Sequence, residues 1–172
     1  MSLSMHRLRR AFWLVPAAAA AALDLWSKAI WDYPPSPGTD GSLKPTQFAL
    51  IENWLYVHTK WNPYGAWSSQ VPDWLLFWGT VAAVPLIALW IFLPKASSAW
   101  DSSAKALVLG GAVGNLYDRW QWGQVRDWID FCLGDFEKGW HYPTFNVADI
   151  ALVAGIVMLL LGGVRKRPAE AA

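Results

Sequence analysis

The chain has 172 residues, the length of one domain, and only 16% of them are charged, against roughly 25% in soluble proteins. Its 55% hydrophobic content and fourteen tryptophans indicate a membrane protein. The net charge of +1 offers no basic field for phosphates and so excludes a nucleic-acid binder. The single cysteine, Cys132, excludes an internal disulfide and a cysteine-based zinc site.

Hydropathy predicts an all-α polytopic membrane protein, a single domain over residues 1–172. Four transmembrane helices are expected, over about Ala11 to Trp31, Trp74 to Leu93, Ala106 to Trp122 and Val147 to Val164. A cleavable secretory signal is the alternative for the first span. It is less favoured, because the apolar run continues past its alanines into "LDLWSKAIW" and its removal would leave basic loops on inconsistent sides.

Basic residues predict the orientation of these spans. "MHRLRR" precedes the first span, Lys95 and Lys105 lie between the second and third, and "RKR" follows the fourth. Four spans put these segments on one side, which the positive-inside rule makes cytoplasmic, together with both termini. Residues 32–73 and 123–146 are then the outer loops. In the first of them, residues 33–45 form a Pro/Gly-rich connector without a predicted role, and "FALIENWLYVHTKWN" predicts short strands in a small outer sheet.

Charged side chains within a span are functional or paired inside the bundle by default. Asp24 and Lys28 lie four residues apart on one helix face, which predicts either an internal ion pair or a contact to polar parts of a substrate. Asn115, Asp118 and Arg119 also share a face, where Arg119 is expected to neutralise Asp118 in a buried polar network. The glycines between positions 110 and 114 favour close helix packing.

Asp127 and Asp149 are expected at the outer ends of the third and fourth helices, where they can meet at one membrane depth. Two facing carboxyl groups in a partly dry site share a proton, as an aspartic peptidase requires. A proton or cation pathway in a small transporter or channel subunit uses the same residue types, so both readings stay open from spacing alone. Asp130 is expected to face the outer water, and Cys132 to fill apolar space. His6, His58 and His141 are scattered, so no metal site is predicted.

The motifs "GNLYDR", "VRD" and "FNVAD", in this order, resemble those of the bacterial signal peptidase II family of membrane aspartic peptidases. "DLWSK" is similar to that family's element in the first helix, and "WNPYGAWS" to its element in the outer loop. In the latter the glycine falls one place later than in the family pattern, and Trp67 stands where phenylalanine is usual. The resemblance extends over nearly the whole chain.

The resemblance implies an aspartic endopeptidase that cuts diacylglyceryl-modified prolipoproteins on the amino side of the lipidated cysteine. It implies a place in the bacterial inner membrane with the active site near the outer face, contact with membrane lipid and no cofactor. The sequence identifies no oligomeric partner, and a monomer is expected. The catalytic dyad is implied to be Asp127 and Asp149. The implied substrate-binding or supporting residues are Asp24, Lys28, Asn62, Asn115, Asp118, Arg119 and Asn146.

Overall fold

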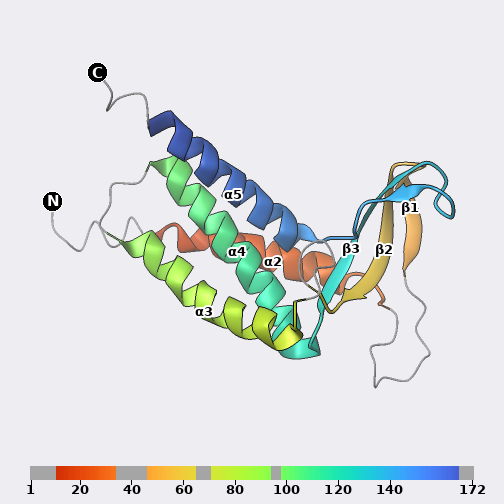
Figure 1. Cartoon of the computed structure of the whole chain (residues 1–172), viewed down its shortest axis with the longest axis horizontal. Coiled ribbons are helices and arrows are strands. Elements are labelled where there is room, and N and C mark those ends of the chain that lie inside the picture. Colours follow the sequence, from red (N-terminus) through yellow and green to blue (C-terminus); the bar gives the residue numbers. More distant parts are fainter. Residues whose placement is uncertain (1–10, 34–45, 65–70, 94–97, 167–172) are drawn as a thin grey trace.

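The computed structural model describes residues 11–33, 46–64, 71–93 and 98–166. Its helices are α2 (Leu14–Ala29), α3 (Asp73–Phe92), α4 (Ala99–Trp122) and α5 (Val147–Lys166), and its strands are β1 (Gln47–Ile51), β2 (Leu55–Asn62), β3 (Val125–Leu133) and β4 (Trp140–His141). The helices lie side by side, and the sheet projects sideways from one end of them (Figure 1). The Pro/Gly-rich connector after Tyr33, Trp67 and most of the basic residues that predicted the orientation lie outside the described residues.

α4 is the central helix and packs against α2, α3 and α5. Its glycines make the close approach possible, as the sequence predicted. A Cβ at Gly110 would lie 2.5 Å from the carbonyl oxygen of Ala17 in α2, and Gly111 faces the backbone of α5 as closely. Apolar residues such as Ala17, Leu109 and Ile91 form the core between α2, α3 and α4.

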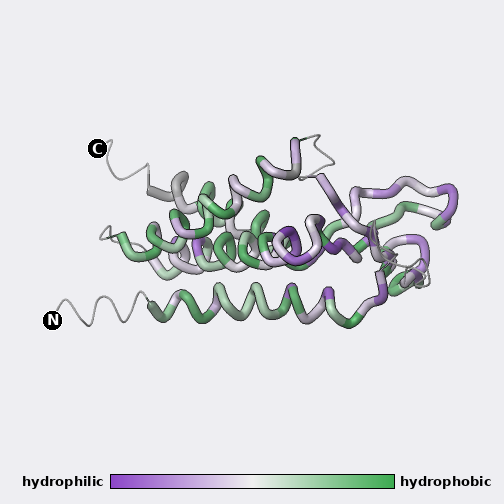
Figure 2. Tube along the Cα trace, turned by 90° about the horizontal axis from the view of Figure 1, so that it is seen from below, coloured by the Kyte–Doolittle hydropathy of each residue, from purple (hydrophilic) through white to green (hydrophobic). Residues whose placement is uncertain are grey.

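Large apolar side chains cover the outside of the helices, as expected for surfaces that face lipid. Leu86 and Leu89 of α3 are 65% and 58% exposed, and Leu160 of α5 is 67% exposed. Figure 2 shows the helices as largely hydrophobic and the sheet as mixed. Among the described residues, Trp74–Phe92 is long and apolar enough to cross a membrane, and Val147–Gly162 is a shorter apolar helix.

The third helix begins at Ala99, earlier than the predicted Ala106. Ser98 caps it by accepting a hydrogen bond from the Asp101 backbone N–H at 3.1 Å. Lys105 therefore lies inside the helix and not in a loop. The helix accommodates this charge because the ammonium lies 4.6 Å from the centre of the Trp90 ring of α3.

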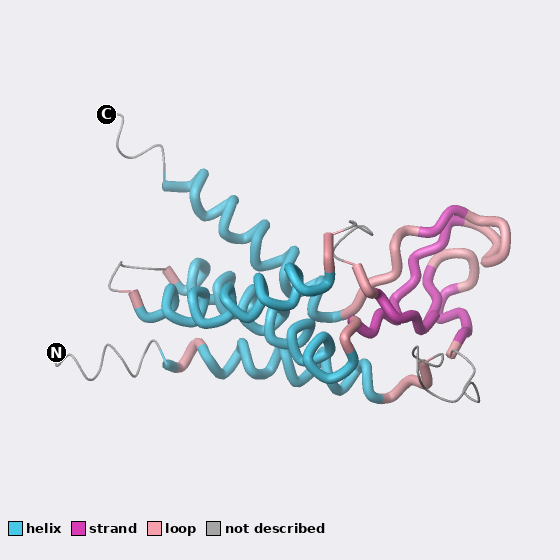
Figure 3. The backbone as a smooth tube through the Cα atoms, turned by 60° about the horizontal axis from the view of Figure 1, so that its bottom comes forward, coloured by secondary structure: helices cyan, strands magenta, loops and turns pink. Residues whose placement is uncertain are grey.

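The sheet is antiparallel, with the order β1-β2-β3-β4. Figure 3 shows its strands grouped beyond one end of the helices. The strands predicted in the first outer loop are confirmed as β1 and β2, but β3 and β4 come from residues 123–146, where only a loop was expected. Gly123 ends α4 in the left-handed region, with φ of 72°, so the chain reverses into β3. Trp31 at the end of α2 packs against Phe48 of β1 and Trp128 of β3, which joins the sheet to the helices.

Candidate active site

Asp127 and Asp149 come together where β3 meets the start of α5. Asp127 lies on the strand β3 and not at the end of a helix as predicted, because α4 has already ended at Gly123. The two aspartates share Asn146 as a partner. The side-chain amide of Asn146 donates to Oδ1 of Asp127 at 2.6 Å, and its backbone N–H donates to Oδ2 of Asp149 at 3.2 Å.

Asp149 belongs to the first turn of α5, which Asn146 caps. The Asp149 backbone N–H donates to Oδ1 of Asn146 at 3.0 Å, and the carboxylate of Asp149 accepts from the Asn146 backbone in return. This reciprocal pair is a capping box, which satisfies two backbone N–H groups at the helix start. The sequence "NVAD" carries this signal. The same residues that begin the helix therefore fix the Asp149 carboxylate.

Asp127 is only 2% exposed, and each of its oxygens accepts one neutral amide hydrogen bond. Asn62 at the end of β2 donates to Oδ2 at 2.9 Å, and Asn146 donates to Oδ1. Burial, followed by the negative charge of Asp149, raises the pKa of Asp127 to about 7 against an ordinary value of 3.8. A carboxyl group in this position can hold a proton near neutral pH.

The amides of Asn62, Asn115 and Asn146 each contact one group that can only donate a hydrogen bond, and this contact determines how each amide is oriented. The Tyr64 backbone N–H meets Oδ1 of Asn62 at 2.9 Å, and the Asp149 backbone N–H meets Oδ1 of Asn146. The Lys28 ammonium meets Oδ1 of Asn115 at 3.0 Å. Each amide must therefore direct its NH₂ group away from that donor. As a result all three NH₂ groups donate to the two aspartates, Asn115 to Oδ1 of Asp149 at 2.8 Å.

A fully buried ionic network supports the Asp127–Asp149 pair through Asn115 and the start of α5. Lys28 contacts Asp24 at 2.7 Å and Asp118 at 3.0 Å, and all three side chains are 0% exposed. The predicted ion pair of Asp24 and Lys28 is thus confirmed. The other oxygen of Asp24 accepts from the Ala148 backbone N–H of α5 at 2.8 Å. Buried charges of this kind require full compensation, which the network provides.

The partner predicted for Asp118 is wrong. Arg126 at the start of β3 forks onto Oδ1 of Asp118 at 2.7 and 3.1 Å, and its backbone N–H donates to Oδ2. Arg119 follows Asp118 directly on the helix, so the two side chains point in different directions. The Arg119 guanidinium donates instead to the Tyr64 carbonyl at 3.5 Å.

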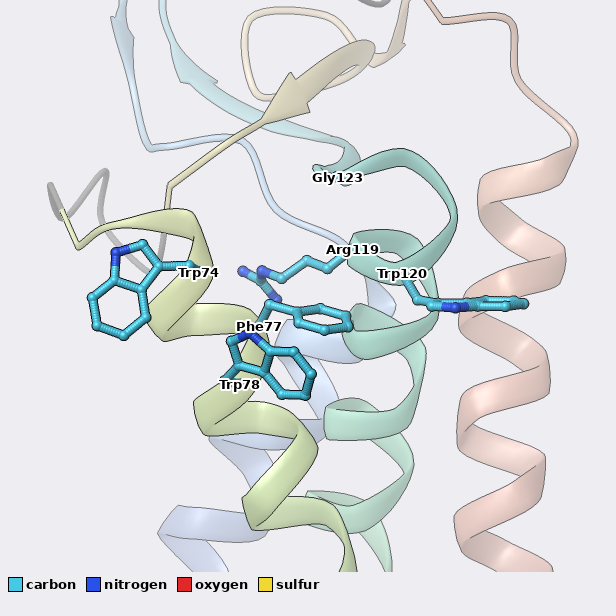
Figure 4. Close-up of a pocket in the computed structure, with 6 residues that line it drawn as sticks. All are labelled: Trp74, Phe77, Trp78, Arg119, Trp120 and Gly123. Carbon is cyan, nitrogen blue, oxygen red and sulfur yellow. The ribbon is translucent and has the colours of Figure 1, made fainter.

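Arg119 lines a pocket of about 270 Å³ between α3 and α4. Figure 4 shows its side chain extending from α4 toward α3, and Gly123 lies at the end of α4 above it. The remaining lining residues are aromatic: Trp74, Phe77, Trp78 and Trp120. Neither Asp127 nor Asp149 lines this pocket, so the pocket does not contain the aspartate pair.

Asp130 does not face the outer water as predicted, because two histidines bury it completely. His58 of β2 lies 2.9 Å from one carboxylate oxygen, and His141 of β4 lies 2.7 Å from the other. The hydrogen bond to Asp130 is the main cause that raises the pKa of His141, whereas burial lowers the pKa of His58. Cys132 is also buried, in agreement with its predicted role as a filler.

Sequence reasoning missed Arg126 and the cluster of Asp130 with its two histidines. The strand pattern of "VRDWIDFCL" was available as a signal, but two aspartates and an arginine within it concealed the period of two. No group of three histidine, cysteine or acidic side chains among the described residues has the geometry of a metal site.

Comparison with known proteins gives one consistent family. Residues 16–165 match the family described as signal peptidase (SPase) II. A lipoprotein signal peptidase of Pseudomonas paraeruginosa is 34% identical over 171 residues, which cover 98% of this chain and 97% of that protein. One from Rhodopirellula baltica is 37% identical over 160 residues, covering 84% and 68%. One from Vibrio vulnificus is 36% identical over 124 residues, covering 69% of each.

Two solved structures share the fold. Both are described as bacterial membrane enzymes, with TM-scores of 0.75 and 0.70 at 20% and 21% sequence identity. The alignments cover 93% of this chain and 92% of the first structure, and 91% and 94% for the second.

Proposed function

The chain belongs to the signal peptidase II family of bacterial membrane proteases, and we propose that it is a lipoprotein signal peptidase whose catalytic dyad is Asp127 and Asp149. One observation carries the assignment of the dyad. Two carboxyl groups from separate elements share Asn146, and each accepts two hydrogen bonds from asparagine amides or backbone N–H groups. The donors hold both groups in place, while burial and the negative charge of Asp149 favour a neutral carboxyl at Asp127.

The chemistry is addition of water to a peptide carbonyl. The ionised aspartate takes a proton from water as its oxygen attacks the carbonyl carbon, and the protonated aspartate donates to the carbonyl oxygen. The tetrahedral intermediate then loses its amine, which leaves with a proton. Asn62 and Asn146 hold Asp127 in place, and Asn115 holds Asp149, so the pair requires little reorganisation during the reaction.

The substrate in this proposal is a prolipoprotein whose signal peptide spans the bilayer and whose cysteine carries diacylglycerol. Cleavage on the amino side of that cysteine requires a dyad near the membrane surface, because the acyl chains stay in the lipid. The four helices span the inner membrane with both termini cytoplasmic, and the sheet lies on the outer side. The exposed apolar side chains of α3 and α5 support this immersion.

The polar residues gather at the end of the helices that bears the sheet, which is where this substrate would present its cleavage site. A transporter requires an ionisable site near the midplane with access to both faces. The family of the chain and the position of its carboxyl groups both favour the protease over this alternative.

Purified protein in lipid or detergent, incubated with a diacylated prolipoprotein and with its unlipidated form, tests the function. We expect cleavage of the lipidated form, and loss of cleavage in Asp127→Asn and in Asp149→Asn. Glu137→Gln is a matched control, because Glu137 is an exposed carboxylate away from the dyad. Normal cleavage by either dyad variant would refute the proposed mechanism.

A further inference from the structure

We propose that the two aspartates have fixed and different roles, in which Asp149 carries the negative charge and acts as the base, and Asp127 carries the proton and acts as the acid. This inference rests on the proposed function and assigns the two steps of that chemistry to individual residues. The number of hydrogen bonds does not distinguish the two groups, because each accepts two. The surroundings of the two carboxyl groups distinguish Asp149 from Asp127.

Asp149 lies in the first turn of α5, where the helix carries a partial positive charge. Its Oδ2 accepts directly from a backbone N–H at this terminus. A capping box of this kind favours the charged carboxylate, which interacts with the aligned peptide dipoles of the whole helix.

A cation also supports Asp149 through a single intermediate side chain. The Lys28 ammonium donates to Oδ1 of Asn115, and the NH₂ group of Asn115 donates to Oδ1 of Asp149. A positive charge on one side of an amide polarises the N–H bonds on the other, which strengthens their interaction with an anion. Lys28 is fully buried, so water does not screen this effect.

Asp127 lies on β3, and strands have only small dipoles. Its two donors are the neutral amides of Asn62 and Asn146. Burial and the charge of Asp149 raise its pKa to about 7, which agrees with a proton held at this position, and the more distant charge of Lys28 opposes them.

The other charged groups near the pair are compensated or exposed. Asp24 also accepts from the start of α5, but Lys28 neutralises it at 2.7 Å. Asp118 is held between Lys28 and Arg126. Lys60, the partner of Asp127 across the strands, is 47% exposed and lies 3.9 Å from Asp130. The difference between the aspartates therefore comes from the helix terminus and from the Lys28–Asn115 pair.

The steps balance with these roles. Asp149 takes one proton from water as the C–O bond forms, while Asp127 gives its proton to the carbonyl oxygen. The intermediate carries two hydroxyl groups. As the C–N bond breaks, Asp149 transfers its proton to the amine nitrogen, and one hydroxyl proton returns to Asp127. The enzyme then has its starting protonation state, and one water has been consumed.

Infrared spectroscopy of the purified protein tests the assignment without requiring turnover. The carbonyl stretch of a buried, protonated carboxyl group is followed as the pH rises from 5 to about 9. We expect this band in the wild-type protein, with a midpoint near pH 7. Asp127→Asn should remove it. Asp149→Asn should keep it but shift its midpoint to lower pH, because the charge that opposes ionisation of Asp127 is lost.

Asn62→Ala provides a second variant that leaves both carboxyl groups in place. The side-chain amide of Asn62 stabilises the ionised form of Asp127, so its removal should move the midpoint of the infrared band to higher pH. Glu137→Gln should leave the band unchanged. The assignment is overturned if the wild type has no such band, if Asp149→Asn removes it while Asp127→Asn keeps it, or if Asn62→Ala leaves the midpoint in place.

The infrared result and the cleavage result can fail separately. Loss of cleavage in both dyad variants, together with an infrared band that belongs to Asp149, would keep the proposed function and reject this division of roles. An infrared band that belongs to Asp127, together with normal cleavage by a dyad variant, would reject the proposed mechanism and the acid and base roles, and would keep only the position of the proton.

Discussion

Gly114 of α4 faces the buried carboxylate of Asp24. Gly114→Ala therefore tests how tightly the helices hold the ionic network of Asp24, Lys28 and Asp118. A Cβ at this position would lie 2.5 Å from Oδ2 of Asp24 and 3.3 Å from Cβ of Ala148. Ordinary van der Waals contact begins at 3.4 Å, so the carboxylate would have to move by about 0.9 Å, the difference between these distances.

Asp24 has little freedom to make this movement. Its Oδ2 bonds Lys28 at 2.7 Å, its Oδ1 bonds the Ala148 backbone of α5 at 2.8 Å, and the side chain is 0% exposed. Overpacking of this kind costs about 1–3 kcal/mol. A displaced Lys28 would also move Asn115, the donor to Asp149. Misplacement of catalytic groups by about 1 Å costs on the order of 100-fold in rate.

We therefore expect Gly114→Ala to lower both the melting temperature in detergent and kcat/KM for a lipidated substrate, the latter by about 100-fold. Gly79→Ala is the matched control, because Gly79 lies in α3 with no atom within 4 Å of its added Cβ. That variant should keep full activity and gain about 0.5–1 kcal/mol from the better helix propensity of alanine. Wild-type activity and stability in Gly114→Ala would show that the network tolerates this displacement.

Three further predictions concern other polar groups of the helix end and the sheet. Asp118→Asn should lower the free energy of unfolding by about 3–5 kcal/mol, because the Lys28 and Arg126 cations lose the charge of their shared partner. Some cleavage should remain. Full stability in a denaturation assay with no turnover in a cleavage assay would contradict this. Asn146→Ala should lower the free energy of unfolding by about 1 kcal/mol because a helix cap is lost, and it should also abolish most activity because Asp127 loses a hydrogen bond. An equal loss of activity when an exposed helix cap is replaced by alanine would argue against the role of Asn146 at Asp127. Hydrogen exchange at the Tyr142 amide should quicken as the pH rises through the raised pKa of His141, because the contact of His141 to Asp130 stabilises β3 and β4 more strongly while His141 is protonated. An exchange rate without this transition in the wild type, corrected against His141→Ala, would refute it.

Local patterns in the sequence predict much of the architecture. Apolar runs long enough to form helices, glycines that allow close packing, and charges at helical spacing indicate the four helices and the Asp24–Lys28 pair. These features depend on residues near one another along the chain, where periodicity is a direct physical signal. The predicted spans also brought Asp127 and Asp149 together at the ends of neighbouring helices; the two are close, but Asp127 lies on β3 and not at a helix end.

Contacts between distant residues required the tertiary structure. Asp118 pairs with Arg126 because the chain reverses at Gly123. Helical spacing alone predicts Arg119 as the partner of Asp118. Asp130 is buried because β2 and β4 bring two histidines to it from opposite sides.

The sequence alone thus determined which residues carry charge within an apolar chain, since the cost of burying charge makes each one conspicuous. Only the tertiary structure decided the surroundings in which these charges lie. It placed Asp149 at a helix terminus and Asp127 on a strand between neutral amides. The electrostatic environment of a carboxyl group depends on dipoles and cations from several elements, and no local pattern of residues encodes that sum.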